Sequence, residues 1–452
     1  MPRKAAGRRA RSGGTLERAD GRSAGGGAMS SEPAPRAAVE PGRGPAKRAV
    51  AAALLGLGVG PALAEDGWLQ QESATGDWGG ARQRLVAAGI TPAAGYTTDL
   101  LGNPKGGARQ GFEYAGELEA SLEFDLERLL GFSGSSFSIG ASWASGRDLS
   151  ERRIGNLFTV AQAFEGQSVR LAQMYLEQAL LEDRLSLAIG RLSTGEDFAT
   201  SELYDNYVNS GVNGNPASIS TNAPSFSSDP VAAWGLRAVF EPDARWRLAA
   251  GVYNADPRIG DDDRNGVDFV LNPQDGVLAI AEAGYRRNQA DGDTGLPGNV
   301  TIGGYYDSSD YESFSDPGDE RKGNYGLYLL LDQMVYREGG AGSEQGLTPW
   351  AAFTLAPVER VNTLPFFAAA GLVYQGLLPG RGDDITNLGV YYGSFSDDLP
   401  DQSFETVVEV NHRFQAAPWL YVTPDFQYVI RPGGSDEEPD AVVLGAEIGI
   451  EF

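Results

Sequence analysis

The chain has 452 residues, 41% of them apolar, and carries 61 acidic against 36 basic side chains, a formal net charge of -25. Nucleic acid is therefore an unfavourable partner, because phosphate backbones attract basic proteins. Cysteine is absent and His412 is the single histidine, which excludes thiol catalysis and cysteine-ligated metal sites and leaves one residue for histidine chemistry.

The N-terminal part differs from the rest. Residues 1–47 form a basic, low-complexity extension, which we exclude from the fold, and Met29 is an alternative start. The apolar run 49–60 follows two basic residues and precedes a small-x-small pattern that ends at Ala64, as in secretory signal peptides. We predict that 48–64 holds the signal-peptide core and cleavage site, since a membrane-spanning helix needs about 20 apolar residues.

Cleavage after residue 64 would remove 11 basic and 4 acidic groups, leaving 25 basic and 57 acidic ones, a net charge of -32. Such an acidic surface suits a compartment where divalent cations and lipopolysaccharide meet protein loops. Solvated loop carboxylates explain most of the excess equally well.

The next segment, 65–94, is expected to contain one short helix. Asp77 is available as its N-cap, Arg82 and Arg84 follow in the first turns, and Gly89 is placed to end it. Two roles are open for this helix: it could narrow the mouth of the fold that follows, or fill the entry of the first strand.

From residue 95 onward, apolar residues repeatedly occupy every second position, which is the period of a β-strand. Between Tyr114 and Leu126, the apolar residues alternate with a stripe that includes Glu117, Glu119 and Glu123. Such a stripe cannot face lipid, where a charge is costly, and it cannot lie in a dry core. It must line water, which in a closed sheet means the lumen.

The C-terminal segments show the same division. Apolar residues alternate from Val442 to Phe452, and charge collects on one face of 404–415. Strands in soluble proteins usually have about 5 or 6 residues. These segments are longer, and their length matches the roughly 9 to 11 residues of a tilted transmembrane strand.

We therefore predict an all-β fold, an antiparallel outer-membrane β-barrel of about sixteen strands over 95–452, because single-chain bacterial barrels have an even strand number. Short links alternate with long ones, as expected for periplasmic turns and external loops. A barrel of this size leaves an aqueous channel. The segments are centred near residues 95, 120, 139, 175, 188, 236, 250, 282, 303, 328, 351, 369, 390, 409, 425 and 446.

The segment 75–82, TGDWGGAR, resembles the opening signature of the OprB-type carbohydrate-selective porins. Later pieces agree in order, and the likeness covers 68–452: they include Gly190-Arg191-Leu192, Val252-Tyr253-Asn254, Ala281-Glu282-Ala283-Gly284-Tyr285 and Pro424-Asp425-Phe426-Gln427-Tyr428. The resemblance implies a sixteen-stranded outer-membrane barrel that passes glucose and other small sugars or polyols by passive diffusion, without catalysis or a cofactor.

Side chains at alternate positions of a strand point to opposite faces of the sheet, and we call this alternation its parity. Parity places nine charged side chains on the water side, as candidates for lining such a channel. Facing acids and bases would create a transverse field that orders water and disfavours apolar solutes, although each charge could equally be solvated or paired with a neighbour. The nine are Glu117, Glu119, Glu123, Glu177, Arg237, Arg247, Glu405, Glu409 and Arg413.

One loop opens like an EF-hand, with Asp261, Asp263, Asn265 and Gly266 in D-x-[DN]-x-[DN]-G spacing. The match fails at its twelfth position, where Asn272 stands in place of the bidentate Glu that calcium requires. A hydrated external loop is therefore favoured over a metal site.

Three other functions compete with carbohydrate diffusion. A general or cation-preferring porin agrees with the acidic charge. A barrel enzyme would need a Ser-His constellation, but parity places His412 on the lipid side near a strand end. A gated receptor would need about 22 strands and a plug. The expected partners are small carbohydrates, outer-membrane lipid and lipopolysaccharide, and the choice between a homotrimer and a monomer is open.

Overall fold

The computed structural model describes residues 67–452, except 164–165, 257, 262–263, 273, 317 and 341. The predicted extension, signal peptide and alternative start lie outside the described residues. Sixteen long strands and one two-residue strand account for most of the described chain. Their bounds are β1 Ile90–Lys105, β2 Gly111–Asp125, β3 Ser135–Gly146, β4 Val169–Leu180, β5 Leu185–Leu192, β6 Ala233–Asp243, β7 Trp246–Asn254, β8 Val277–Arg287, β9 Gly298–Glu312, β10 Glu320–Gln333, β11 Tyr336–Arg337, β12 Gly346–Leu355, β13 Phe366–Gln375, β14 Ile385–Ser394, β15 Phe404–Ala417, β16 Leu420–Ile430 and β17 Ala441–Glu451.

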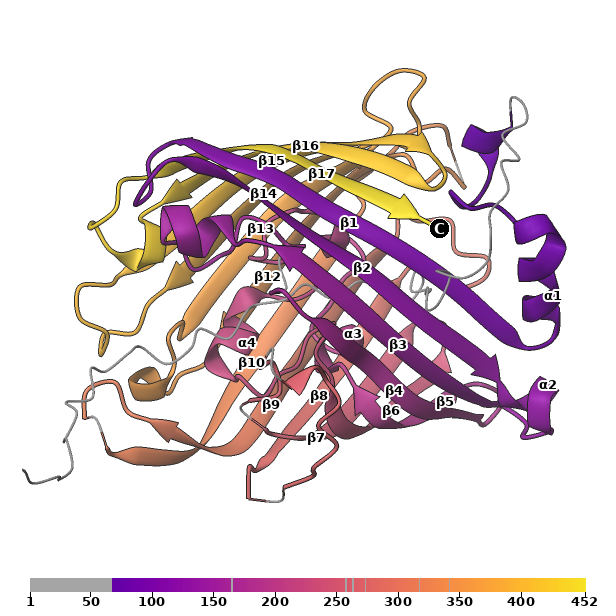
Figure 1. The fold of residues 1–452 in the computed structure, drawn as a ribbon, viewed down its shortest axis with the longest axis horizontal. Helices are drawn as coiled ribbons and strands as arrows, with labels where there is room; N and C mark the ends of the chain where they lie inside the picture. The colour runs from indigo at the N-terminus through magenta and orange to yellow at the C-terminus, as the bar shows by residue number, and fades with distance from the viewer. Residues whose placement is uncertain are drawn as a thin grey trace, which may run out of the picture. The chain divides into compact units, whose positions relative to one another are not determined.

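The long strands form one closed antiparallel barrel (Figure 1). Each pairs with its neighbours along the chain, and β1 closes the sheet by pairing with β17, with Tyr96 opposite Ile450. β11 belongs to the turn before β12, with which it pairs. All sixteen predicted centres fall inside long strands, so the predicted fold class and strand number are confirmed.

The two faces of the barrel follow the predicted parity. On β17, Leu444 is 49% exposed, whereas its neighbour Val443 is fully buried. On β2, Phe112 and Tyr114 are 60% and 45% exposed, whereas Glu117 is 4% exposed. Because successive side chains of a strand point to opposite faces, apolar residues cover the outside and polar ones point inward.

The two ends of the barrel differ in the length of their connections. Turns as short as 244–245 and 418–419 lie at one end, and the long loops 147–168, 193–232 and 255–276 lie at the other. The short-turn end also carries the C-terminus and the helices α1 Ala81–Ala87 and α2 Leu126–Leu130 (Figure 1). In bacterial barrels the short turns face the periplasm.

The predicted N-terminal helix is present as α1, but its N-cap is Gly80 and not Asp77. A 3-10 turn, Trp78–Gly80, separates Asp77 from the helix, and Asp77 Oδ1 still accepts a hydrogen bond from the Gln83 N–H at 3.3 Å. Gly89, with φ +89°, follows the helix end as predicted.

The described helices that remain are brief: η2 Trp68–Gln70, η4 Ser150–Ile154, α3 Thr194–Asp197, η5 Tyr204–Asn206, α4 Ala217–Asn222, η7 Glu359–Val361 and η8 Pro432–Gly434. Every helix in the described part of the chain falls short of the length and apolar character needed to cross a bilayer.

Candidate functional site

Two long loops, 147–168 and 193–232, fold into the barrel and pack against its inner wall. They bond to each other: Gln162 N–H donates to the Val208 carbonyl, and Ser210 N–H donates to the Thr159 carbonyl, both at 2.9 Å. Their apolar side chains form a core inside the barrel. The members no more than 3% exposed include Leu149, Ile154, Phe158, Val160, Tyr204, Tyr207, Val208, Val212, Ile219 and Phe226. The lumen is thus partly filled by protein.

Glu405 holds the first of these loops. Its side chain, fully buried, accepts hydrogen bonds from the backbone N–H groups of Leu157 and Phe158, the shortest at 2.8 and 2.7 Å. A third backbone N–H, that of Gly433, donates at 2.6 Å. A carboxylate that accepts several N–H groups is a strong, directional anchor.

Glu409 holds the second loop in the same manner. Its carboxylate, also fully buried, accepts from the N–H groups of Val208 and Asn209 at 2.7 and 3.3 Å. Tyr391 Oη and Asn411 Nδ2 each donate at 2.7 Å. Parity thus placed both glutamates correctly on the inner side of β15, but the loops that they anchor also cover them.

An aromatic cluster fixes loop 193–232 to β12–β14. The Tyr204 and Tyr207 rings meet Trp350 edge-on, with centroids 5.1 and 5.4 Å apart. Trp350 Nε1 donates to Tyr207 Oη at 2.7 Å, and Tyr207 Oη donates in turn toward the Leu388 carbonyl at 3.1 Å. Trp350 Nε1 and Tyr207 Oη therefore each have a hydrogen-bond partner.

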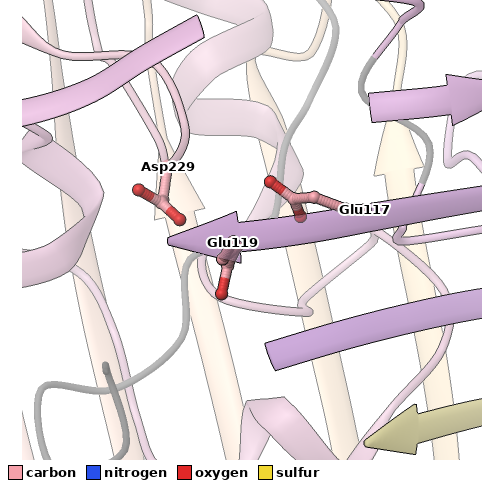
Figure 2. Close-up of side chains that lie close together, drawn as sticks. All are labelled: Glu117, Glu119 and Asp229. Carbon is pink, nitrogen blue, oxygen red and sulfur yellow. The ribbon is translucent and has the colours of Figure 1, made fainter. Parts of the chain in front are cut away.

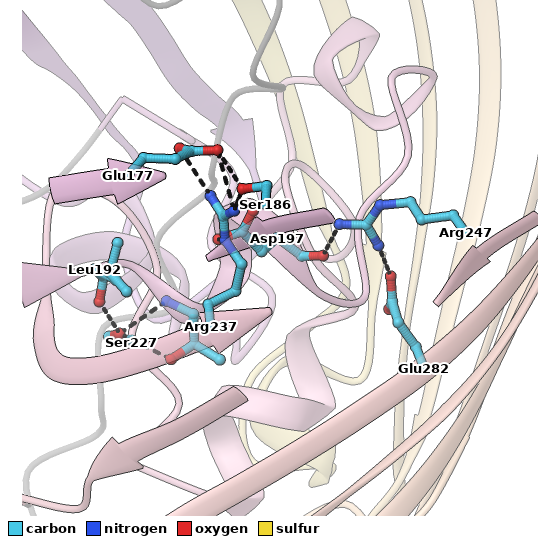
Figure 3. Close-up of polar contacts among 9 residues, drawn as sticks. Glu177, Ser186, Leu192, Asp197, Ser227, Arg237, Arg247 and Glu282 are labelled. Atoms are coloured by element: carbon cyan, nitrogen blue, oxygen red, sulfur yellow. Dashed lines mark hydrogen bonds and ion pairs between the residues drawn. The ribbon is translucent and has the colours of Figure 1, made fainter. Parts of the chain in front are cut away.

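Arg237 connects the barrel wall to α3 (Figure 3). Its Nε lies 2.9 Å from Asp197 Oδ2 on the loop, and its Nη1 lies 3.4 Å from Glu177 Oε1 on β4. The same Nη1 donates to Ser186 Oγ at 2.7 Å. The Arg237 side chain is only 9% exposed, so its charge is satisfied mainly by these partners.

Arg247 makes a parallel connection from β7 (Figure 3). Its Nη1 lies 2.5 Å from Glu282 Oε1 on β8, and its Nη2 donates to the Asp197 carbonyl at 3.0 Å. Glu282 Oε2 accepts from the Ala199 N–H at 3.0 Å and from Tyr328 Oη at 2.8 Å. Segment 194–199 is therefore fixed to the wall at several points.

Beside this segment lies a cavity of about 420 Å³ against the inner wall of β7–β12. Acidic side chains of the loop, Glu196 and Glu202, line it together with Arg247 and Arg286 of the wall. Asp332 lines it too and accepts from Asn299 Nδ2 at 3.0 Å. The hydroxyl groups of Thr200, Ser201 and Thr301 complete a mixed surface of donors and acceptors.

A second acidic group lies on the opposite wall. Single carboxylate oxygens of Glu117, Glu119 and Asp229 all lie within 4.8 Å of one another (Figure 2). Glu117 and Glu119 come from β2, and Asp229 comes from the inward loop. Such a group raises the local negative potential along the inner surface.

The remaining candidates differ in surroundings. Glu123 is exposed near the short-turn end of β2, and Arg413 lies over the Tyr421 ring, with its Cζ 3.4 Å from the ring centroid.

In the EF-hand-like loop, Asp263 lies outside the described residues and Asp261 is exposed. The Asn265 carbonyl accepts from the Leu171 N–H at 3.0 Å.

His412 shares the outward parity of Val410, as predicted, but its ring is engaged in a turn and does not lie free at the interface. Its Nδ1 lies 2.8 Å from Thr386 Oγ1, and its Nε2 lies 3.4 Å from Asp384 Oδ2. Asp384 also accepts twice from Arg381, at 2.7 and 2.8 Å.

Sequence reasoning did not select several residues of this site. Glu282 and Asp332 lie on inward positions of their strands, so the parity that selected the nine charges could have selected them too. Asp197, Glu202 and Asp229 carry no such signal, because they belong to an irregular loop. Their positions depend on where that loop folds.

Comparison with known proteins agrees with the geometry. The family described as carbohydrate-selective porin, OprB family, matches residues 109–452. Porin B of Pseudomonas aeruginosa is 27% identical over 444 residues, covering 88% of this chain and 95% of that protein. The putative porin QuiX of Acinetobacter baylyi is 24% identical over 439 residues, covering 89% and 98%.

Solved structures show the same architecture. The high-pH structure of Pseudomonas putida OprB has 25% sequence identity and a TM-score of 0.79, covering 86% of this chain and all of that one. The low-pH structure of the same protein has 22% identity and a TM-score of 0.58, covering 85% and 99%.

Proposed function

This chain belongs to the OprB family of carbohydrate-selective porins, and from that premise we propose that small neutral sugars or polyols such as glucose cross it through the cavity beside α3. It is an integral outer-membrane protein, and its family is one of porins and not an enzyme class. Transport is passive diffusion.

The observation that carries the proposal is the cavity itself. About 420 Å³ lies within the range of small-molecule sites. Acidic groups of a loop, arginines of the wall, and hydroxyl and amide groups all line it. A sugar hydroxyl both donates and accepts hydrogen bonds, so it finds partners of both kinds.

The charges also explain why an apolar solute would pass poorly. Charges of both signs in the lining of the cavity orient water within it, and an apolar solute must displace that water without replacing its hydrogen bonds. Each sugar contact is weak and exchangeable with water, so exit stays fast. Among the nine predicted residues, Arg247 lines the cavity, whereas Glu405, Glu409 and Arg237 would act by holding the loops in place.

Sugar flux into liposomes tests the proposal. Glu202→Gln and Asp332→Asn keep the side-chain shape and remove the charge at the cavity. We expect the glucose flux to change relative to the potassium chloride conductance of the same preparations. Glu437→Gln, in the exposed loop after β16, is the matched control. An unchanged ratio in both cavity variants would remove the cavity from the sugar route.

A general, cation-preferring channel is the second candidate function. The group formed by Glu117, Glu119 and Asp229 supports it, because carboxylates along an inner wall attract cations. The reversal potential in a salt gradient discriminates between the two functions. Glu119→Gln with unchanged glucose flux but reduced cation preference would assign separate roles to the two walls.

An enzymatic role would use the cluster of Asp384, His412 and Thr386, which contains the single histidine of the chain. The cluster lies at a turn on the outward side of β15, and Arg381 already occupies the aspartate. An esterase assay on purified protein, with Thr386→Ala as control, tests this alternative. Activity that is lost in the variant would establish it.

A further inference from the structure

At the long-loop end of the barrel, the wall formed by β5–β7 stops short of the strands beside it. β5 ends at Leu192, β6 begins only at Ala233, and β7 ends at Asn254. β5 has eight residues, fewer than the roughly 9 to 11 that a tilted transmembrane strand needs. The neighbouring β3 and β4 have twelve each. A notch is therefore left above β5–β7.

The described residues of the loop 255–276 fill this notch. Its Asn265 carbonyl accepts from the Leu171 N–H of β4 at 3.0 Å, on the part of β4 that continues beyond its pairing with β5. Arg170 of β4 donates to the carbonyls of Ile259 and Gly260, at 3.1 and 2.7 Å. The loop is thus bonded to the wall and is not a free external loop.

The outer side of the wall shows where the loop emerges. Ile189 and Leu236 lie opposite each other and are 59% and 51% exposed, as lipid-facing residues should be. Arg191 and Trp234 lie opposite each other two residues further along, so they share this outward face. Yet Arg191 is only 4% exposed.

The loop covers Arg191. The Asp268 carbonyl accepts from Arg191 Nη1 at 3.0 Å, and the Phe269 ring centroid lies 5.9 Å from Arg191 Cζ and 6.1 Å from the Trp234 ring. Segment 268–270 therefore lies on the outside of the barrel. It shields an arginine that would otherwise face lipid.

The surface that this segment presents is apolar. Val267, Phe269, Val270 and Leu271 are 57%, 47%, 71% and 60% exposed. The acidic group among them is ion-paired: Arg264 Nη1 lies 3.2 Å from Asp268 Oδ2 and also pairs with Asp256. Exposed apolar groups of this kind mark an interaction surface.

We propose that residues 267–271 are a membrane-contact segment that binds the acyl chains of outer-leaflet lipid and completes the lipid-facing belt above β5–β7. The segment continues the exposed apolar wall of the barrel, and this continuity identifies lipid as the partner. Val252 of β7 is 50% exposed below the loop, beside Ile189 and Leu236, so the belt runs from the strands onto the loop. The inference rests on the place of the barrel in the outer membrane.

Single cysteines test the proposal, since the chain has none of its own. Val270→Cys is labelled with an environment-sensitive fluorophore in the full barrel, which is then reconstituted into vesicles containing lipids with nitroxide-labelled acyl chains. Val252→Cys is the control for the lipid-facing wall, and Ala108→Cys, exposed in the loop 106–110, is the control for an external loop in water.

We expect the label at 270 to lose most of its fluorescence to the nitroxide lipids, as at 252, and to resist iodide, which quenches the label at 108. Iodide quenching at 270 without lipid quenching would overturn the proposal. Protection from both quenchers, with cross-linking between two Val270→Cys chains, would overturn it in favour of a second copy. Loss of lipid quenching at 252 as well would instead show that the barrel is not inserted.

Discussion

Replacing Glu405 by alanine should release the loop 147–168 from the wall and leave the barrel folded. The variant deprives three backbone N–H groups, those of Leu157, Phe158 and Gly433, of the carboxylate that they share. A buried donor without a partner costs about 1 to 3 kcal/mol. Removal of the buried carboxylate offsets part of this cost, because its own desolvation is unfavourable.

Only Leu157 and Phe158 belong to this loop, so a net loss of about 2 to 3 kcal/mol follows from two donors at the lower part of that range. One factor of ten corresponds to about 1.4 kcal/mol, so the open population of the loop should rise by about one to two orders of magnitude. The antiparallel pairing of β15 with β14 and β16 does not involve the side chain. The barrel should therefore stay closed.

Amide hydrogen exchange in detergent or lipid measures this opening directly. Exchange at Leu157 and Phe158 should accelerate strongly in Glu405→Ala, while amides of β15 keep their protection. Glu123→Ala is the matched control, because it removes an inward but exposed glutamate. Equal protection of both loop amides in wild type and Glu405→Ala would refute the anchoring role, even if the sugar flux of the variant differed from wild type.

Two further predictions concern charged anchors. Arg237→Ala leaves Asp197 and Glu177 without their shared cation. Breaking a fully buried pair costs roughly 3 to 5 kcal/mol, and the cost is smaller here because Glu177 is 29% exposed. Single-channel recordings should show new gating noise, and recordings as quiet as wild type would contradict the prediction. At Asp384, burial opposes ionisation, but hydrogen bonds from Arg381 and from a backbone N–H outweigh it and lower the pKa. Its stabilising contribution is therefore complete above the ordinary carboxyl pKa, about 3.9, and is lost as the pH falls through the lowered value. Asp384→Asn should melt below wild type at neutral pH and converge with it in strong acid, and a constant difference across that range would exclude the ion pair as the cause.

The sequence by itself determined the barrel. A strand has a side-chain period of two, so the order of apolar and polar residues from Tyr114 to Leu126, or from Val442 to Phe452, states which side meets lipid and which meets water. Strand number, fold class and family resemblance all followed from local patterns. The inward parity of Glu405 and Glu409 came from the same rule.

The tertiary structure alone decided what those inward charges contact. Parity could not show that the loops 147–168 and 193–232 fold back over Glu405 and Glu409, because irregular loops have no period to read. The N-cap of α1 is Gly80 and not Asp77, because a 3-10 turn lies between Asp77 and the helix. Arg191 occupies an outward position that its strand pattern would assign to lipid, yet a loop remote in sequence covers it.

The physical reason for this division is the range of the interactions involved. Alternation between hydrocarbon and water acts on each strand separately and is recorded in adjacent residues. The position of a loop depends on hydrogen bonds between residues hundreds of positions apart, such as that from the Phe158 N–H to Glu405, and these exist only once the barrel has closed.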